Sequence, residues 1–328
     1  MLFVVSKLNI YLKKEDAINT SEMSEQEMWL ALPAVEKEEK ADLLISLARA
    51  ASFRGSHGQS LELAQAALEI YEEMGAAAPL TEIANCHWGL GFAYRALNQK
   101  DKAIEEIDAA IKFYQEANYP FLDDVLRSRA QWCAEMEDWE GTLAANLEAV
   151  RQNEIEGNAE WEAKSWLNVG YTYSNMKRFP EAIEAFITAK AKFLELKMVH
   201  QVARCDRWLS DCYSDLGEGT QAYEFARRSM NVSELMQNPM PIMFSAFVLG
   251  KALLVLEKYE EAELHLTNAY NAATQVDAAE MDWEFIVKIQ RQRINLLRSQ
   301  DRITEAEELE SRIATVTEVI EIRNKSEE

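Results

Sequence analysis

Glycine and proline are scarce in this chain, with 11 and 6 residues among 328. Both interrupt helices, so their scarcity, together with only short runs of β-branched residues, favours an all-α protein. No stretch approaches 18 consecutive apolar residues, which argues against a transmembrane helix. Residues 1–14 carry their lysines after a very short apolar run, the reverse of a secretory signal peptide. We expect a cytoplasmic protein that does not enter a membrane.

Cysteine and histidine number four each, and neither set has the spacing of metal ligands. All four cysteines fall in expected helices, where reduced thiols that pack in a core are the simplest interpretation. The sequence has no P-loop, no GxSxG turn and no glycine-rich phosphate loop. No nucleophile is paired with a base. These absences predict a protein that is not an enzyme and uses no cofactor and no metal.

Basic residues are outnumbered by acidic residues, 34 to 56, which gives a formal net charge of −22. A surface of this sign repels phosphate, so binding of nucleic acid or of an anionic membrane is disfavoured. The hydrophobic content of 48% is too high for a disordered chain. We therefore expect a folded protein whose partner is another protein or a peptide.

A repeat of about 40 residues fills most of the chain. A small residue recurs at this interval, and a second follows 12 positions later. The pairs are Gly91/Ala103, Gly170/Ala182, Ser210/Ala222 and Gly250/Ala262, with looser copies at Ala48/Ser60, Ala130/Thr142 and Ile294/Ala306. Glycine inside a helix costs about 0.5–1 kcal/mol relative to alanine, so its recurrence at one position predicts close contact between helices. Seven copies predict an elongated array of helix pairs.

Turn residues and periodicity predict the helix limits. First helices are expected at about 40–54, 80–97, 121–136, 159–177, 199–216, 241–257 and 280–300. Second helices are expected at about 59–74, 99–117, 139–156, 180–197, 220–237, 259–276 and 302–323. Residues 22–32 predict a short helix that caps the array and ends before Pro33. The expected organisation is an N-terminal segment over 1–36, the array over 37–323 and a disordered tail over 324–328.

The pattern resembles the tetratricopeptide repeat over about residues 40–323. Repeat four carries the resemblance best, with Trp166, Val169, Gly170, Tyr173, Ala182, Phe186 and Ala189 at the family's spacing. Repeat three departs most, because Arg129 and Asn146 stand where large apolar residues are expected. The family's basic repeat is 34 residues, so the longer step is similar to the long-helix variety of bacterial peptide receptors and eukaryotic scaffold proteins. The resemblance implies a right-handed superhelical solenoid with a concave groove made by the first helices.

The resemblance also implies which side chains face that groove: positions 2, 5, 9 and 12 of each repeat, with the small residue counted as position 8. These positions hold ten basic and three acidic residues, a reversal of the sign of the whole chain. Asn168 at position 6 lies beside them and could hold a peptide backbone. The candidate ligand-binding residues are Arg49, Trp88, Phe92, Arg95, Arg127, Lys164, Asn168, Tyr171, Arg204, Arg207, Phe244, Phe247, Lys251, Lys288, Arg291 and Arg298.

Two interpretations of this basic face are open. In the first, the cations pair with acids on neighbouring helices, such as Glu135 or Asp215, and hold the solenoid together. In the second, they form a groove for an acidic peptide or partner segment, in which the aromatic residues anchor apolar side chains. The alternatives are a peptide-gated sensor that changes superhelix shape to control a partner, and single-stranded nucleic-acid binding. A homo-oligomer is compatible with each of them.

Overall fold

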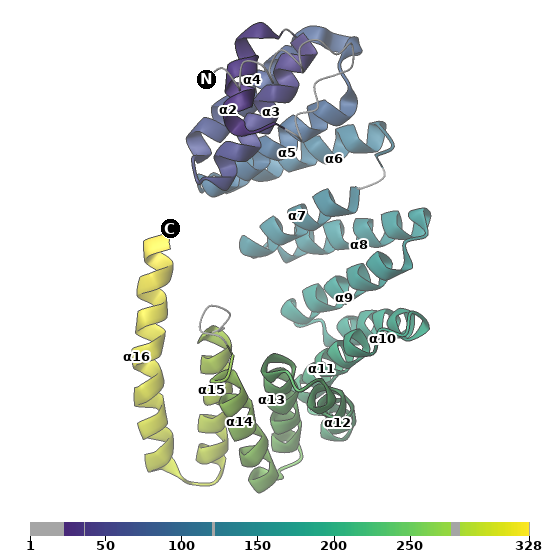
Figure 1. The fold of residues 1–328 in the computed structure, drawn as a ribbon. Coiled ribbons are helices and arrows are strands. Elements are labelled where there is room, and N and C mark those ends of the chain that lie inside the picture. The colour runs from purple at the N-terminus through teal and green to yellow at the C-terminus, as the bar shows by residue number, and fades with distance from the viewer. Residues whose placement is uncertain (1–22, 36, 120–121, 277–282, 328) are drawn as a thin grey trace. The chain divides into compact units, whose positions relative to one another are not determined.

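The computed structural model describes residues 23–35, 37–119, 122–276 and 283–327. Within these ranges the chain is helical and has no strand (Figure 1). A short helix α2 (Glu25–Ala31) and a 3₁₀ turn η2 (Leu32–Ala34) come first. The helix pairs of the first four repeats are α3 (Lys37–Phe53) with α4 (His57–Met74), α5 (Leu80–Ala96) with α6 (Lys100–Glu116), α7 (Leu122–Glu135) with α8 (Trp139–Glu156), and α9 (Ala159–Asn175) with α10 (Phe179–Glu195). The remaining pairs are α11 (Val199–Asp215) with α12 (Gly219–Met236), α13 (Pro239–Val255) with α14 (Tyr259–Ala273), and α15 (Trp283–Ser299) with α16 (Ile303–Glu327).

The seven helix pairs predicted from the repeat are confirmed. Two terminal elements differ from the prediction: helix α16 is longer than expected, and the capping helix expected over residues 22–32 begins at Glu25. Helix α16 continues to Glu327, so the tail expected over 324–328 begins at least four residues too early. Helix α2 begins at Glu25, behind a capping box in which the Ser24 side chain accepts from the Glu27 backbone N–H. Most of the predicted segment 1–36 lies outside the described residues.

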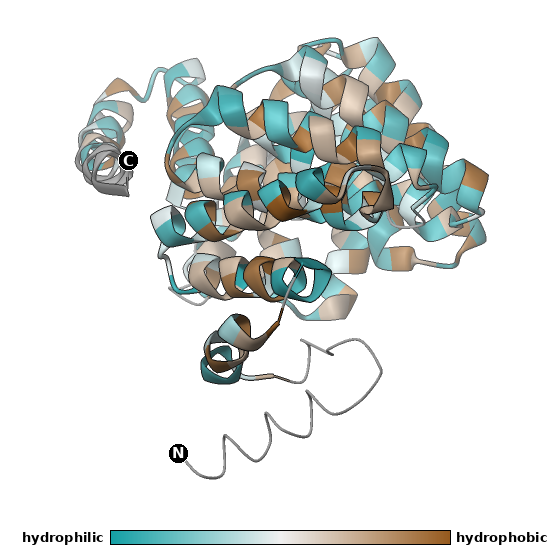
Figure 2. Cartoon of the chain, turned by 90° about the horizontal axis from the view of Figure 1, so that it is seen from above, coloured by the Kyte–Doolittle hydropathy of each residue, from teal (hydrophilic) through white to brown (hydrophobic). Residues whose placement is uncertain are grey.

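The chain divides into two compact units, residues 1–152 and 153–328. The first unit holds α2 to α7 and most of α8, and the second holds the end of α8 and α9 to α16. Each unit has its own hydrophobic clusters, which are formed where the apolar sides of successive helices meet. Hydrophilic and hydrophobic residues alternate along the helices, as expected of helices with one buried side (Figure 2). None of the described helices is both long and apolar enough to cross a membrane.

The recurring small residue lies where two helices touch. A Cβ atom added to Gly170 would lie 2.6 Å from the ring of Phe186, and one added to Gly250 would lie 2.7 Å from Leu266. The partner side chains belong to the second helix of the same pair. Gly89, which is outside the small position, has only Ile45 nearby, at 3.6 Å. The prediction that the recurring small residue allows two helices to make close contact is therefore confirmed for Gly170 and Gly250.

Left-handed backbone conformations end the helices at the turns. Eight described non-glycine turn residues have φ between 50° and 59°: Asn98, Asn118, Glu137, Lys177, Lys197, Gln237, Glu257 and Asp301. Gly55, Gly157 and Gly217 take the same role at three other turns. At the turn after α9, for example, the Arg178 N–H donates to the Tyr173 carbonyl at 2.9 Å, which satisfies an acceptor that the helix end would leave free.

Repeat three fits the array although its sequence departs from the pattern. Arg129 donates to the Asp108 carboxylate and, at 3.1 Å, to the Gly141 carbonyl, so its charge is satisfied at the helix boundary. Hydrogen bonding to Asp108 is the main reason that the pKa of Arg129 is raised. Asn146 is 5% exposed, so a polar side chain occupies an interior place here. The expected register holds in spite of both residues.

Candidate ligand-binding face

The predicted basic residues of the first unit have partners within the chain. Arg95 forms a two-bonded pair with Glu135, in which Nε and Nη2 lie 2.8 and 2.6 Å from the two carboxylate oxygens. These hydrogen bonds hold the pKa of Glu135 below its ordinary value. Arg127 pairs with Asp124 and, at 3.3 Å, with Asp123. The interpretation that cations join neighbouring helices is confirmed for Arg95, whose partner Glu135 is 40 residues away.

Arg49 lies among acceptors as well. Its Nη2 donates to Asn85 Oδ1 at 3.2 Å, and it lines a small pocket together with Asp42 and Glu82. Aromatic rings accompany these charges: Phe92 is 39% exposed and packs edge-on against Trp132 at 5.1 Å, and Trp88 lies beside it at 5.9 Å. The first unit therefore presents rings, but its basic side chains on this face already contact oxygen acceptors.

Three predicted basic residues of the second unit are paired too. Lys164 lies 2.6 Å from Glu160, and Arg298 lies 2.7 Å from Glu310. Lys251 contacts Asp211 and Asp215, each at 2.6 Å. Burial alone would lower the pKa of Lys251, but the two carboxylates outweigh it and raise that pKa. Lys251 thus links α13 to α11 through two ion pairs. This agrees with the first interpretation, in which a basic residue pairs with an acid such as Asp215 on a neighbouring helix.

Four predicted basic residues differ from these, since none has an ion pair among the described residues: Arg204, Arg207, Lys288 and Arg291. Arg207 is the most enclosed. Burial, and secondly the neighbouring charge of Arg204, lower its pKa to about 10. The side chain still carries its charge at neutral pH. A partly buried cation beside a second cation, with no ion pair to a carboxylate in the part of the chain that the structure describes, is unusual in a protein of net charge −22.

Three of these cations, Arg204 and Arg207 on α11 and Lys288 on α15, lie near a group of phenylalanine rings on α13 and α15. The guanidinium carbon of Arg207 lies 5.2 Å from the centre of the Phe244 ring. The rings of Phe244 and Phe285 are 4.6 Å apart, and Lys288 Nζ lies 6.0 Å from Phe285. Because α11 and α13, and α13 and α15, are in direct contact, residues one repeat apart become neighbours. We call Arg204, Arg207, Phe244, Phe285 and Lys288 the Arg204 cluster.

Sequence reasoning misplaced one ring and missed another. Phe247 was expected to face a ligand, but it is 1% exposed, because its ring packs against Phe285 at 5.0 Å. Its exposure was wrongly predicted, and its part is to support the cluster from beneath. Phe285 itself was not among the predicted site residues. It stands one helical turn before Lys288, and that spacing is the signal that could have identified it.

The other predicted residues of the second unit lie near the cluster or beyond it. Tyr171 is 43% exposed, and its ring contacts Trp208 edge-on at 5.2 Å. Asn168 is half-buried one turn before Tyr171 on α9. Arg291 is exposed and borders a shallow pocket with Ile313 of α16. No contact of the described residues joins Arg291 to the rings, so it is a neighbour of the cluster and not a member.

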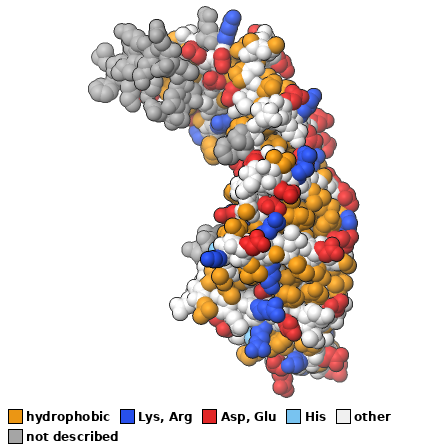
Figure 3. All heavy atoms as spheres, turned by 90° about the vertical axis from the view of Figure 1, so that its right-hand side faces the viewer, with side chains coloured by type: hydrophobic (Ala, Val, Ile, Leu, Met, Phe, Trp, Pro, Cys, Tyr) orange, Lys and Arg blue, Asp and Glu red, His pale blue; other side chains and the backbone are white. Residues whose placement is uncertain are grey.

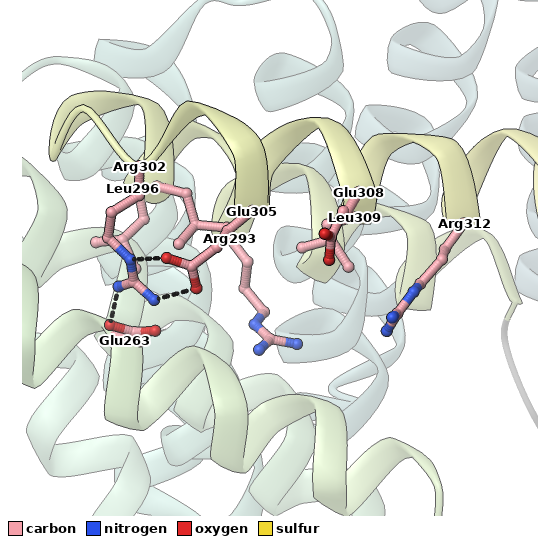
Figure 4. Close-up of a pocket in the computed structure, with 9 residues that line it drawn as sticks. Glu263, Arg293, Leu296, Arg302, Glu305, Glu308, Leu309 and Arg312 are labelled. Carbon is pink, nitrogen blue, oxygen red and sulfur yellow. Dashed lines mark hydrogen bonds and ion pairs between the residues drawn. The ribbon is translucent and has the colours of Figure 1, made fainter.

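A separate pocket between α14, α15 and α16 has balanced charges (Figure 4). Its charged lining consists of Arg293, Arg302, Arg312, Glu263, Glu305 and Glu308. Figure 4 shows the Arg302 guanidinium between two carboxylates, which are Glu263 at 2.8 Å and Glu305 at 2.7 Å. On the face drawn in Figure 3, basic, acidic and hydrophobic side chains are likewise interspersed. Such mixed surfaces lack the unbalanced charge of the Arg204 cluster.

Comparison with known proteins agrees with this fold. The model of the tetratricopeptide repeat matches residues 84–117 and 163–190, which cover most of α5–α6 and of α9 with the first part of α10. The chain is thus an array of helix pairs of the tetratricopeptide type, as the resemblance of its sequence indicated. Among curated proteins, none matches the sequence.

Several solved structures share the architecture. The apo form of RapI superposes with a TM-score of 0.59 at 12% identity, covering 86% of this chain and 99% of that one. Aspartyl phosphate phosphatase F from Bacillus subtilis gives 0.57 at 14% identity, covering 95% and 80%. NprR in complex with its cognate peptide NprX gives 0.53 at 15% identity, covering 84% and 78%. At these identities, the similarity establishes the fold.

Proposed function

We propose that this protein is a non-enzymatic binding module that captures an acidic peptide, or an acidic segment of a partner protein, on the first helices of its second unit. One observation carries the proposal: Arg207 is enclosed against Phe244 without a carboxylate partner among the described residues, and Arg204 adds a second charge beside it. The five paired cations, in contrast, show how this chain neutralises a basic residue when it serves only to join helices.

The energetics favour an anionic ligand at this place. A guanidinium that has lost part of its hydration gains about 1.5–3 kcal/mol from a charge-assisted hydrogen bond to a carboxylate. The half-buried rings of Phe244 and Phe285 offer contact area for an apolar side chain next to that carboxylate. Nucleic acid fits less well, because its backbone would meet the acidic remainder of the chain. That a protein of this fold, NprR, holds a peptide supports the choice of a peptide ligand.

Binding of a labelled peptide tests the proposal. The probe is a short fluorescein-labelled peptide of glutamate and leucine, and its anisotropy is followed on titration with the whole chain. The variant with both Arg204→Gln and Arg207→Gln should lose at least about tenfold in affinity, equivalent to about 1.4 kcal/mol. The matched variant with Lys164→Gln and Arg298→Gln removes two paired cations and should bind as the unaltered chain does.

Two results would contradict the proposal. If both double variants lost affinity for the peptide equally, affinity would depend only on net charge. If the unaltered chain did not bind the peptide, the proposal that it captures an acidic ligand would be wrong. A gel shift with single-stranded RNA and DNA at low salt provides the comparison with nucleic acid. Small-angle scattering with saturating peptide then distinguishes the alternatives within the proposal: a changed scattering curve favours the peptide-gated sensor, and an unchanged curve favours the passive adaptor.

A further inference from the structure

The Arg204 cluster has a cation beside each of its two rings. Arg207 on α11 lies 5.2 Å from the Phe244 ring, and Lys288 on α15 lies 6.0 Å from the Phe285 ring and 5.3 Å from the buried Phe247 ring. The two rings contact each other at 4.6 Å, so cation, ring pair and cation form a continuous series. Neither cation has an ion pair among the described residues. The cluster is therefore built to meet two separate negative charges with an apolar group between them.

The dimensions of this series restrict the ligand. Its three steps, from guanidinium carbon to ring, ring to ring, and ring to ammonium nitrogen, measure 5.2, 4.6 and 6.0 Å. An extended peptide advances about 3.3 Å per residue, so no more than about five residues span the whole series. Side chains two residues apart point to the same side of an extended peptide. Positions i, i+2 and i+4 of one segment can then contact the first cation, the rings and the second cation.

The neighbouring part of the face disfavours a simple run of acids. Asp211 and Asp215 follow Arg207 by one and two turns of α11, and together they carry one more charge than Lys251 neutralises. Additional acidic residues of a ligand that extended along α11 would be repelled there. Specificity arises from such unfavourable contacts as much as from the favourable ones.

We infer that the preferred ligand is a peptide segment with an acidic residue at i, an aliphatic or aromatic residue at i+2 and an acidic residue at i+4. This inference rests on the proposed function and adds to it the spacing that the site selects. The acid at one end is held by Arg207 with Arg204, the central side chain lies on Phe244 and Phe285, and the second acid is held by Lys288.

The test compares three peptides of equal length, the first two of which have identical composition. One carries the Glu-x-Leu-x-Glu pattern in a background of serine and glycine, a second has the two glutamates adjacent and the leucine displaced, and a third replaces the second glutamate by glutamine. In fluorescence anisotropy with the whole chain, the patterned peptide should bind about tenfold more tightly than either of the others.

A variant of Lys288 on α15 tests whether this lysine contacts the second acidic residue of the peptide. Lys288 is exposed, so Lys288→Gln leaves the fold intact, which a thermal melt verifies. This variant should weaken the patterned peptide about tenfold and leave the glutamine-substituted peptide unaffected, because the contact is already missing there. Arg298→Gln, which removes a paired cation, should weaken neither.

The outcomes separate this inference from the proposed function. If the rearranged peptide binds as tightly as the patterned one and both depend on Arg204 and Arg207, the acidic ligand stands and the spacing is wrong. A Lys288→Gln variant that weakens all peptides equally would also overturn the spacing. If no acidic peptide binds, the proposed function and the inference fall together.

Discussion

Arg207 lies over the ring of Phe244, with 5.2 Å between its guanidinium carbon and the ring centre. A ring face attracts a cation, but it replaces only part of the hydration that burial removes, and no carboxylate of the described residues forms an ion pair with Arg207. The lowered pKa of Arg207 has this cause. Burial of this charge therefore lowers the stability of the folded chain, and the proposed acidic ligand would offset that cost.

Replacement of Arg207 should separate stability from binding. In Arg207→Met, an unbranched apolar side chain replaces the guanidinium that lies over Phe244, so the charge is lost while part of the apolar packing is kept. We expect the free energy of unfolding to stay the same or to rise by up to about 2 kcal/mol, while affinity for the acidic peptide falls. Urea denaturation and peptide anisotropy measure the two quantities. A clear loss of stability would show that the charge has an unrecognised partner.

Lys251 and Lys288 should respond in opposite ways to the same change. Lys251→Met leaves the buried Asp211 without its partner and should lower the free energy of unfolding by roughly 3 kcal/mol. Lys288→Met removes an exposed cation that has no ion pair within the described part of the chain, and it should change this free energy by less than about 0.5 kcal/mol. Urea denaturation of the two variants side by side provides the measurement. Similar effects in both would contradict the division between paired and unpaired cations.

Two glycines of the first helices offer a matched test of the repeat. In Gly170→Ala the new Cβ would collide with the enclosed ring of Phe186, so we expect a loss of about 1–3 kcal/mol despite the better helix propensity. In Gly89→Ala the nearest atom is at 3.6 Å, and a gain of about 0.5–1 kcal/mol is expected. Melting temperatures should move in opposite directions. A gain at Gly170 would show that the small position has another cause.

Burial of His265 predicts a dependence of stability on pH. Burial lowers its pKa from the ordinary 6.5, against the smaller opposing effects of Glu261 and Glu234. Below about pH 6.5 the unfolded chain therefore binds more protons at this residue than the folded chain does. The free energy of unfolding should fall as the pH drops from 6.5 towards the lowered pKa. His265→Gln should reduce this slope, whereas His200→Gln, at an exposed residue, should preserve it.

The helix pairs could be predicted because their signals are local. Glycine, proline and the 40-residue spacing of small residues mark each turn and each close contact, and Gly170 against Phe186 shows that the spacing was understood correctly. Which of the basic residues form ion pairs could not be predicted in the same way. Arg95 and Arg207 were both predicted to face the groove, yet Arg95 has Glu135 beside it, whereas Arg207 has no ion pair with any residue that the structure describes. That difference depends on which side chain the next repeat supplies.

Ring burial was equally beyond the sequence. Phe244 and Phe247 stand one turn apart and look alike in the pattern, and both contact Phe285 of the next repeat, yet Phe247 is fully buried and Phe244 is only half-buried. A repeat register gives the direction in which a side chain leaves its helix. The register does not show which side chain of the neighbouring repeat will contact that residue, or how large it is. Those contacts become visible only in the folded array.

The turn residues with left-handed backbone conformation are positions at which substitution by glycine should raise the thermal stability of the array. A residue other than glycine in this conformation carries a steric penalty of roughly 1 kcal/mol, which asparagine tolerates better than lysine or glutamate. Glu137, Lys177, Lys197 and Glu257 are exposed at such turns, so glycine in their place removes the penalty without opening a cavity. Because these turns are separate from the Arg204 cluster, the glycine substitutions should raise the melting temperature of the array and leave that cluster unchanged.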